Sequence, residues 1–135
     1  MAEHRNVDRV RRAYAAFAAG DLPSVLEEFA PDGVMHAGGD GPFSGDHKGR
    51  EAIGAMLIGA FQFTGATQAL ELGGIYADDL HGIVNVRETA TRESDGATLD
   101  MPEVHLMAFG PDGKITDFWD IPEDHDVHDD FFSGR

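Results

Sequence analysis

The strongest constraint that this sequence places on its fold is the order in which two hydrophobic periodicities follow one another. In the first half, apolar side chains recur every three or four residues, the spacing of one face of an α-helix. From about residue 68 they recur every second residue, as in β-strands, and turn residues separate the segments. Helices followed by a run of antiparallel strands are typical of α+β proteins. We therefore expect an α+β fold with a curved antiparallel or mixed sheet, one face of which is covered by helices.

Three helices are predicted in the first half. The first ends at Gly20, a residue type that commonly follows the last turn of a helix. The second begins at Asp21, whose side chain can cap the free N–H groups of the first turn, and it ends at a Pro-Asp-Gly turn. A short strand over 34–37 and a glycine-rich loop over 38–45 lead to the third helix, expected at about 49–61. The apolar stripe of the first helix consists of Val7, Val10, Tyr14 and Phe17.

Four strands are predicted in the second half, and the turns between them are rich in Asp and Gly, which suit tight turns. The chain of 135 residues has the length of a single domain, so we assign all of 1–135 to one unit. The predicted strands lie near 68–77, 81–92, 98–109 and 114–121.

Charge and composition exclude several functions. Lys and Arg number 10 and Asp and Glu 25, which gives a net charge of −15 and argues against binding to nucleic acids or anionic membranes. The chain has no cysteine, so disulfides and thiol chemistry are excluded. Neither a long apolar run nor a signal peptide is present, so we expect a cytoplasmic protein. Seven of the acidic residues lie within 117–130, a segment that we expect to be largely solvated surface.

Several local motifs occur in the order found in one family. Together they resemble the nuclear transport factor 2-like superfamily, in its SnoaL-like and ketosteroid-isomerase-like branch. The resemblance implies a cone-shaped fold that encloses an apolar cavity, and a homodimer formed sheet against sheet. It does not fix a function, because the fold serves isomerases, polyketide cyclases, epoxide hydrolases, dehydratases and non-catalytic binding proteins. The motifs are YAAFAAGDL at 14–22, FAPD at 29–32, GDHKGREAI at 45–53 and DGKITDFWD at 112–120.

His36 and Glu88 are the first candidates for catalysis. His36 lies on the first predicted strand, where the resemblance implies a histidine that points into the cavity and could act as the base. The alternative is a histidine that only satisfies the core or the end of the strand. Glu88 interrupts an apolar strand face, and burial there would raise the pKa of its carboxyl and suit it to acid–base chemistry. Alternatively, the polarity of the two faces reverses there, or Glu88 pairs with an arginine.

His105 and Asp120 are the other catalytic candidates. The resemblance implies that His105 occupies the position of an oxyanion-hole acid, where its imidazole could donate to a substrate oxygen. The alternative is a place at a dimer interface. Asp120 matches a position at which related cyclases carry a catalytic carboxylate. Because Trp119 and Asp120 point to opposite faces of one strand, either Trp119 is a wall of the cavity or Asp120 reaches into it.

Aromatic and apolar residues are expected to form the rest of the binding site. Tyr14 is one residue away from the oxyanion tyrosine of the steroid isomerases, so we interpret it mainly as core. The base position of those enzymes falls on Ala37, which argues against a steroid isomerase. The expected substrate-binding residues are Tyr14, Phe17, Phe29, Phe61, Met107 and Trp119.

No cofactor and no metal are predicted. The loop at 38–45 carries no phosphate-binding motif, and we expect it to border the mouth of the cavity. His125 and His128 could bind a metal from one face of a helix, but an acidic turn anchored by Phe131 and Phe132 is the preferred interpretation.

Two classes of function therefore remain open. The first is a cofactor-independent acid–base enzyme, of the cyclase, isomerase, hydratase or epoxide-opening type, acting on a small and mostly apolar carbonyl or epoxide compound. The second is a protein of the same fold that binds a small molecule without converting it, or that serves as a dimeric interaction module.

Overall fold

The computed structural model describes residues 3–135, in which helices and strands follow the order ααββαββββα. This order contains the predicted one and adds a short strand and a C-terminal helix. The elements are α1 (Arg5–Ala18), α2 (Leu22–Glu27), β1 (Phe29–Ala37), β2 (Gly45–Lys48), α3 (Gly49–Phe63), β3 (Ala69–Ala77), β4 (His81–Thr91), β5 (Thr98–Phe109), β6 (Ile115–Pro122) and α4 (His125–Ser133).

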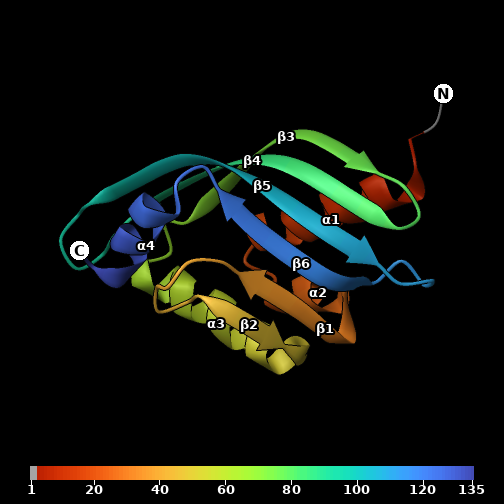
Figure 1. The fold of residues 1–135 in the computed structure, drawn as a ribbon, viewed down its shortest axis with the longest axis horizontal. Helices are drawn as coiled ribbons and strands as arrows, with labels where there is room; N and C mark the ends of the chain where they lie inside the picture. The colour runs from red at the N-terminus through yellow and green to blue at the C-terminus, as the bar shows by residue number, and fades with distance from the viewer. Residues whose placement is uncertain (1–2) are drawn as a thin grey trace.

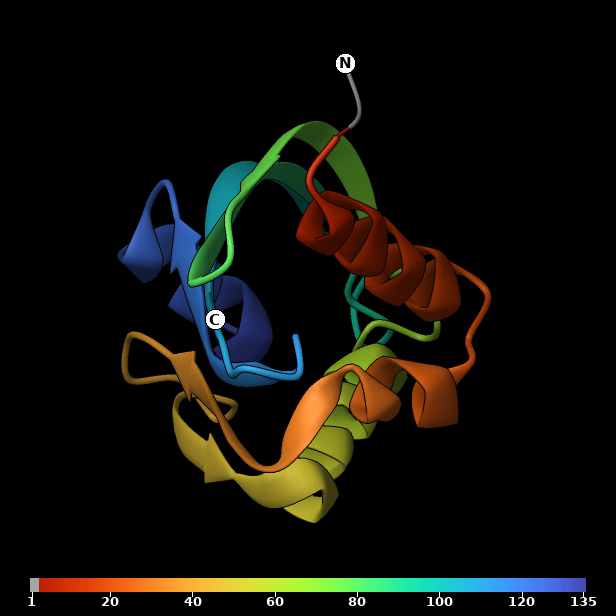
Figure 2. The ribbon, with the colours of Figure 1, turned by 90° about the vertical axis from the view of Figure 1, so that its right-hand side faces the viewer.

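One six-stranded sheet, in the order β2-β1-β6-β5-β4-β3, forms the frame of the molecule. β1 and β6 are parallel and all other neighbours are antiparallel, so the sheet is mixed, as the α+β prediction allowed. Helices α1, α2 and α3 lie on one side of the sheet, and α4 lies at one end of it (Figure 1). The sheet is strongly curved, so that strands and helices together surround a central space (Figure 2).

The first two helices form largely as predicted. Val7 and Val10 are buried, and the side chains of Tyr14 and Phe17 pack against the main hydrophobic core. The Asp21 side chain caps α2 by accepting from the backbone N–H of Ser24. The helix nevertheless ends at Glu27, before the predicted turn.

β1 corrects the prediction of a short strand, because it begins at Phe29 rather than at Val34. Phe29 pairs with Ile115 of β6, and a bulge separates this pair from the regular pairing that resumes at Val34. The backbone N–H of Ile115 also donates to the carbonyl of Glu28. Pairing with a strand that lies far away in the sequence thus extends β1 into a segment that resembles the end of a helix.

The four strands of the second half match the prediction to within about one residue at each end. β4 alternates strictly between exposed and buried positions, as expected for a strand with one solvated face. Its buried side includes Val84, Val86 and Glu88, which face the space between sheet and helices.

The added elements β2 and α4 have weaker sequence signals. β2 is a four-residue edge strand of mostly polar residues that pairs only with β1. α4 forms where an acidic turn was predicted. The Asp124 side chain caps this helix by accepting from the N–H of Val127, and its own Phe131 and Phe132 are buried. Among the described residues, no helix is long and apolar enough to span a membrane.

Candidate functional site

A cavity of about 130 Å³ lies between the concave face of the sheet and the helices. Most of its wall is apolar, which agrees with the expected binding site for an apolar molecule. The glycine-rich loop contributes Gly41, Phe43 and Ser44 to the wall, close to the place expected for it. Apolar lining residues are Phe17, Val25, Phe29, Met35, Phe43, Met56, Leu57, Leu70, Met107, Ile115, Phe118 and Phe132.

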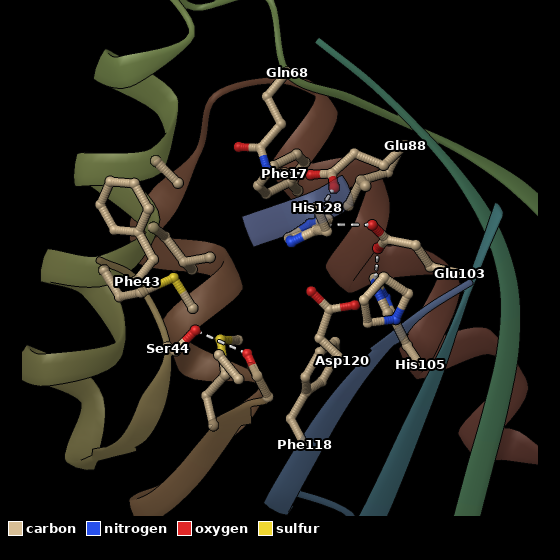
Figure 3. Close-up of a pocket in the computed structure, with 18 of the residues that line it drawn as sticks. Phe17, Phe43, Ser44, Gln68, Glu88, Glu103, His105, Phe118, Asp120 and His128 are labelled. Atoms are coloured by element: carbon tan, nitrogen blue, oxygen red, sulfur yellow. Dashed lines mark hydrogen bonds and ion pairs between the residues drawn. The ribbon is translucent and has the colours of Figure 1, made fainter. Parts of the chain in front are cut away.

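The polar part of the wall is assembled by the register of three neighbouring strands. His105 on β5 pairs directly with Asp120 on β6, and Glu103 lies two residues before His105 on the same face. Glu88 lies diagonally across from Glu103, because Glu103 pairs with Val86 on β4. The strand alternation therefore places three carboxyl groups and an imidazole side by side at the cavity (Figure 3).

His105 is the centre of the first group of polar contacts. Its Nδ1 shares a hydrogen bond with the hydroxyl of Tyr14, which α1 brings across the cavity. Its Nε2 donates to Glu103 Oε1 at 3.1 Å and lies 3.2 Å from Asp120 Oδ1. The side chain of His105 is only 6% exposed, so these contacts are made almost out of water.

His128 of α4 is the centre of the second group. Its Nε2 donates to Glu88 Oε1 at 2.9 Å and lies 3.4 Å from Glu103 Oε2. The amide Nε2 of Gln68, just before β3, donates to the other oxygen of Glu88 at 2.6 Å. Glu103 therefore contacts both histidines, one with each of its oxygens, and joins the two groups (Figure 3).

Two carboxylate oxygens in this network have no hydrogen-bond donor among the described residues: Glu103 Oε2 and Asp120 Oδ1. Each imidazole Nε2 has one N–H, which His105 gives to Glu103 Oε1 and His128 gives to Glu88 Oε1. The two remaining oxygens lie near a histidine without receiving its hydrogen. A buried polar atom without a hydrogen-bond partner is costly, so both oxygens are candidate contacts for a ligand.

Both histidines are held in the charged form. Burial disfavours the imidazolium of His128, but the carboxyl oxygens of Glu103 and Glu88 close to its Nε2 outweigh burial and raise its pKa to about 10. Burial also opposes the charge on His105, yet the neighbouring oxygens of Tyr14, Asp120 and Glu103 raise its pKa well above the ordinary value. The two positive charges of the imidazolium groups thus balance the negative charges of two of the three carboxyl groups in this network.

The carboxyl groups differ in their preferred protonation state. Burial raises the pKa of Glu103 to about 8, so this group holds a proton at neutral pH. Burial acts in the same direction on Asp120, but the imidazolium of His105, 3.2 Å away, outweighs it and lowers the pKa of Asp120. Burial also opposes the charge on Glu88, but His128, Glu103 and Gln68 together outweigh it and lower the pKa of Glu88. An acid and a base therefore both lie close to Nε2 of His105.

Two groups of residues also have the composition of a metal site. Glu88, Glu103 and His128 form one, and Glu103, His105 and Asp120 the other, with ligand atoms within 4.8 Å of one another. The short distances within each group are the hydrogen bonds and ion pairs just described. These contacts explain why the side chains lie close together, and no metal ion is needed. The pair suggested by the sequence does not form such a site, because His128 enters the cavity whereas His125 is exposed.

His36 and Trp119 are not where they were expected. Both lie outside the cavity wall, on the convex face of the sheet, where the two rings stack with centroids 5.0 Å apart. His36 bonds to Asp117 at 2.9 Å and to Asp46 at 2.8 Å, and these contacts raise its pKa. The strand register decides this placement: Met35, and not His36, shares the inner face.

The remaining candidates divide as follows. Glu88, His105 and Asp120 line the cavity, and the alternation that turns Trp119 outward turns Asp120 inward with Phe118. The expected walls Phe17, Phe29 and Met107 line it too, and Tyr14 adds a hydroxyl bonded to His105. Phe61 instead lines a neighbouring hollow against α1 and β3.

Two residues of the site were missed by the sequence analysis. Glu103 lies on the same strand face as His105 and Met107, and this alternation can be read from the sequence. Both faces of the strand are fairly apolar, so the alternation did not single out Glu103. His128 precedes the buried Phe131 and Phe132 by three and four residues, the spacing of one helix face. The many acidic residues around it had suggested a solvated turn instead.

Comparisons with known proteins agree with this architecture. Residues 10–118 match the sequence profile of the SnoaL-like domain. The uncharacterized protein Rv0034 of Mycobacterium tuberculosis is 30% identical over 117 residues, which cover 86% of this chain and 87% of that protein.

Among solved structures, Bal32a from a soil-derived mobile gene cassette is similar with a TM-score of 0.88 and 34% identity, over 94% of this chain and 95% of that one. TerC, which was co-crystallised with polyporic acid, is similar with a TM-score of 0.80 and 22% identity, over 91% of this chain and 95% of that one. The second likeness concerns the fold alone.

Proposed function

This chain belongs to the SnoaL-like domain family, and from that premise we propose that it is a cofactor-independent acid–base enzyme. The family hosts several chemistries on one fold, so the choice among them rests on the site. The proposed substrate is a small, mostly apolar carbonyl or epoxide compound, because most of the cavity wall is apolar and its polar groups gather on one side.

The observation that carries the proposal is the pair formed by Glu103 and Asp120 around His105. Their environments separate their pKa values in opposite directions, so that one is a proton donor and the other a proton acceptor at the same pH. Both reach the cavity, and neither has a hydrogen-bond partner for one of its oxygens. An acid and a base aimed into a mostly dry cavity are the requirement for general acid–base catalysis.

In the proposed reaction, the Asp120 carboxylate removes a proton from the substrate and the Glu103 carboxyl donates one to its oxygen. His105 is a positioning residue whose Nε2 lies within 3.2 Å of both carboxyl groups and keeps Asp120 ionised. The imidazole of His128, which bonds to Glu88, lies 3.4 Å from the other oxygen of Glu103. For a carbonyl compound the outcome is an enol or its isomer. For an epoxide, Asp120 instead takes a proton from an attacking water, Glu103 protonates the epoxide oxygen as the ring opens, and the product is a diol.

The test is turnover of uncharged single-ring probes. Wild-type protein is incubated with 3-cyclohexen-1-one, whose conversion to the conjugated enone is followed by ultraviolet absorbance, and with cyclohexene oxide, whose opening is followed by gas chromatography. Asp120→Asn is expected to lower kcat by about 10²-fold or more, the usual contribution of a general base. His36→Ala is the matched control and should retain the wild-type rate, because His36 lies on the convex face.

Equal rates for wild type and Asp120→Asn would remove Asp120 from the mechanism. If no probe turns over and native mass spectrometry finds an unchanged small molecule bound to the purified protein, the alternative function, binding without conversion, is favoured.

A further inference from the structure

The cavity combines hydrogen-bonding groups of opposite kinds in one place, and this combination restricts the ligand. Asp120 Oδ1 and Glu103 Oε2 are both buried, and neither has a hydrogen-bond partner among the described residues. The Glu103 side chain is only 1% exposed, so water reaches it poorly, and a ligand is the partner that can compensate for its burial.

The charges of the wall exclude anionic ligands. The ionisable groups that line the cavity are four carboxyls, two histidines and the hydroxyl of Tyr14, and no Lys or Arg lines it in the described part of the chain. The histidines already donate to the carboxylates, so neither has an Nε2–H left for a carboxylate or phosphate ligand. An anion would add charge to an acidic space in which both imidazolium groups already pair with carboxyls.

The size of the cavity restricts the ligand further. A volume of about 130 Å³ is close to that of an apolar protein cavity known to hold benzene, about 150 Å³. Phe17, Phe43 and Phe118 provide aromatic surface on the wall that surrounds the polar groups (Figure 3). A single six-membered ring fits this space.

From these observations we propose that the ligand is an uncharged single-ring compound with a hydroxyl group, a phenol or a cyclic enol, whose hydroxyl bonds to Asp120 and Glu103 together. A hydroxyl is suited because it donates and accepts at once. It donates to the Asp120 carboxylate, and it accepts the proton of Glu103. A ketone can only accept and an ammonium can only donate, so each leaves one of the two groups unsatisfied. This inference rests on the proposed function only in taking the cavity as the substrate site. For a carbonyl substrate, it implies that the cavity binds the enol form more tightly than the ketone.

The test compares the binding of matched ring compounds: phenol, toluene of nearly the same shape, benzoate and benzylamine. Dissociation constants come from titrations followed by NMR of the methionine methyl groups. Met35, Met56 and Met107 line the cavity and should shift, whereas Met101 is buried in a separate apolar cluster and should not. Phenol is expected to bind at least about tenfold more tightly than toluene, benzoate or benzylamine, because hydrogen bonds to charged groups are strong.

A variant locates the hydroxyl. Asp120→Asn is expected to reduce the affinity for phenol by about tenfold while the affinity for toluene stays unchanged, which also shows that the variant is folded. Phe43→Ala should lower the affinities for phenol and toluene to a similar degree, because the Phe43 ring contacts either ligand.

Three outcomes would overturn the inference. Toluene that binds as tightly as phenol would show that the two oxygens do not contribute. Benzylamine that binds more tightly than phenol would indicate an organic cation instead. Phenol that leaves the three cavity methionines unshifted would place the ligand elsewhere. Because binding requires no turnover, phenol binding without any converted probe would contradict the proposed function and leave this inference standing.

Discussion

At the scale of single residues, Glu103 connects the whole polar wall of the cavity. His105 contacts one of its oxygens and His128 the other, and its side chain is almost completely buried. Burial therefore acts on Glu103 more strongly than its neighbours do, and its pKa rises to about 8. A carboxyl that retains its proton at neutral pH can serve as a general acid, which a surface glutamate cannot.

The pH dependence of activity tests this role. If protonated Glu103 is the acid, kcat/KM should fall as pH rises through about 8, because the carboxyl then loses the proton that it must donate. Glu103→Gln should have little activity and no descending limb in this range. The measurement is a profile of initial rates between pH 5 and 10. A wild-type rate that stays constant up to pH 10 would contradict the assignment.

The pH dependence of stability tests the ion pairs of His128. Its pKa is raised from about 6.5 in the unfolded chain to about 10 in the folded one by Glu103 and Glu88. A raised pKa stabilises the fold fully below the unfolded value, and the gain is lost as pH rises through the folded value. The raised pKa of Glu103 also makes the stability of the fold decrease as pH rises, mostly at lower pH than for His128.

We therefore expect the thermal unfolding midpoint to decrease between about pH 6.5 and 10, and His128→Gln to show a shallower decrease. Circular dichroism melts at several pH values check this. His81→Gln is the control, since His81 is an exposed histidine and the substitution should leave the slope as in wild type. Identical slopes for wild type and His128→Gln would argue against the ion pairs.

At the scale of elements, α4 depends on tertiary contacts. Phe132 packs against Phe43 and Phe63 with ring centroids about 6 Å apart, and its side chain also lines the cavity. At the same end of the helix, the buried Arg92 donates to the carbonyl of Phe131 and holds the last turn. A nine-residue helix is too short to be stable alone, so these contacts keep His128 at the site.

Phe132→Ala should therefore affect both stability and the site. We expect a loss of about 3–5 kcal/mol in the free energy of unfolding, as for other buried phenylalanines. The measurement is chemical denaturation. Val127→Ala is the matched control on the same helix, because Val127 is 51% exposed, and it should change stability by less than about 0.5 kcal/mol. Similar losses for both variants would mean that α4 is not docked through Phe132.

The glycine-rich loop is a second element whose role depends on a distant residue. Asp129 of α4 is buried, and its Oδ2 accepts from the backbone N–H of Asp40. Gly39 has a φ of +84° and lies so close to this carboxylate that a Cβ would be 2.4 Å from Asp129 Oδ2. One acidic residue of the C-terminal segment is thus a structural anchor for the loop that borders the cavity, and not solvated surface.

At the scale of the whole molecule, the convex face of the sheet carries exposed apolar side chains. Val104 pairs with Ile121 across β5 and β6, and Tyr76 pairs with Ile83 across β3 and β4. All four are at least 36% exposed, although they lie on the face opposite the cavity. Exposed apolar residues concentrated on one sheet face are typical of an interaction surface. We propose that this face forms the homodimer that the family resemblance implies.

Sedimentation velocity tests the dimer. Wild-type protein is expected to sediment as a dimer, and Ile83→Asp as a monomer, because the carboxylate would be buried without a partner. Val127→Asp, at an exposed position of α4, should remain dimeric. A wild-type monomer at micromolar concentration, or a dimeric Ile83→Asp, would exclude this interface.

The sequence by itself determined the fold class and the segments of most helices and strands, because these depend on periodicity and turn residues that lie close together in the chain. It also suggested Glu88, His105 and Asp120, three polar residues on largely apolar strands, and the structure places all three at the cavity.

The tertiary structure alone decided which face each strand turns inward. A shift of one residue in register exchanges the two faces, so Asp120 rather than Trp119 reached the cavity, and His36 was placed outside it. It also brought His128 from the chain's end to Glu88 and Glu103. The charges that set the pKa values of these groups come from residues far apart in sequence, so no local pattern could have predicted which of them holds a proton.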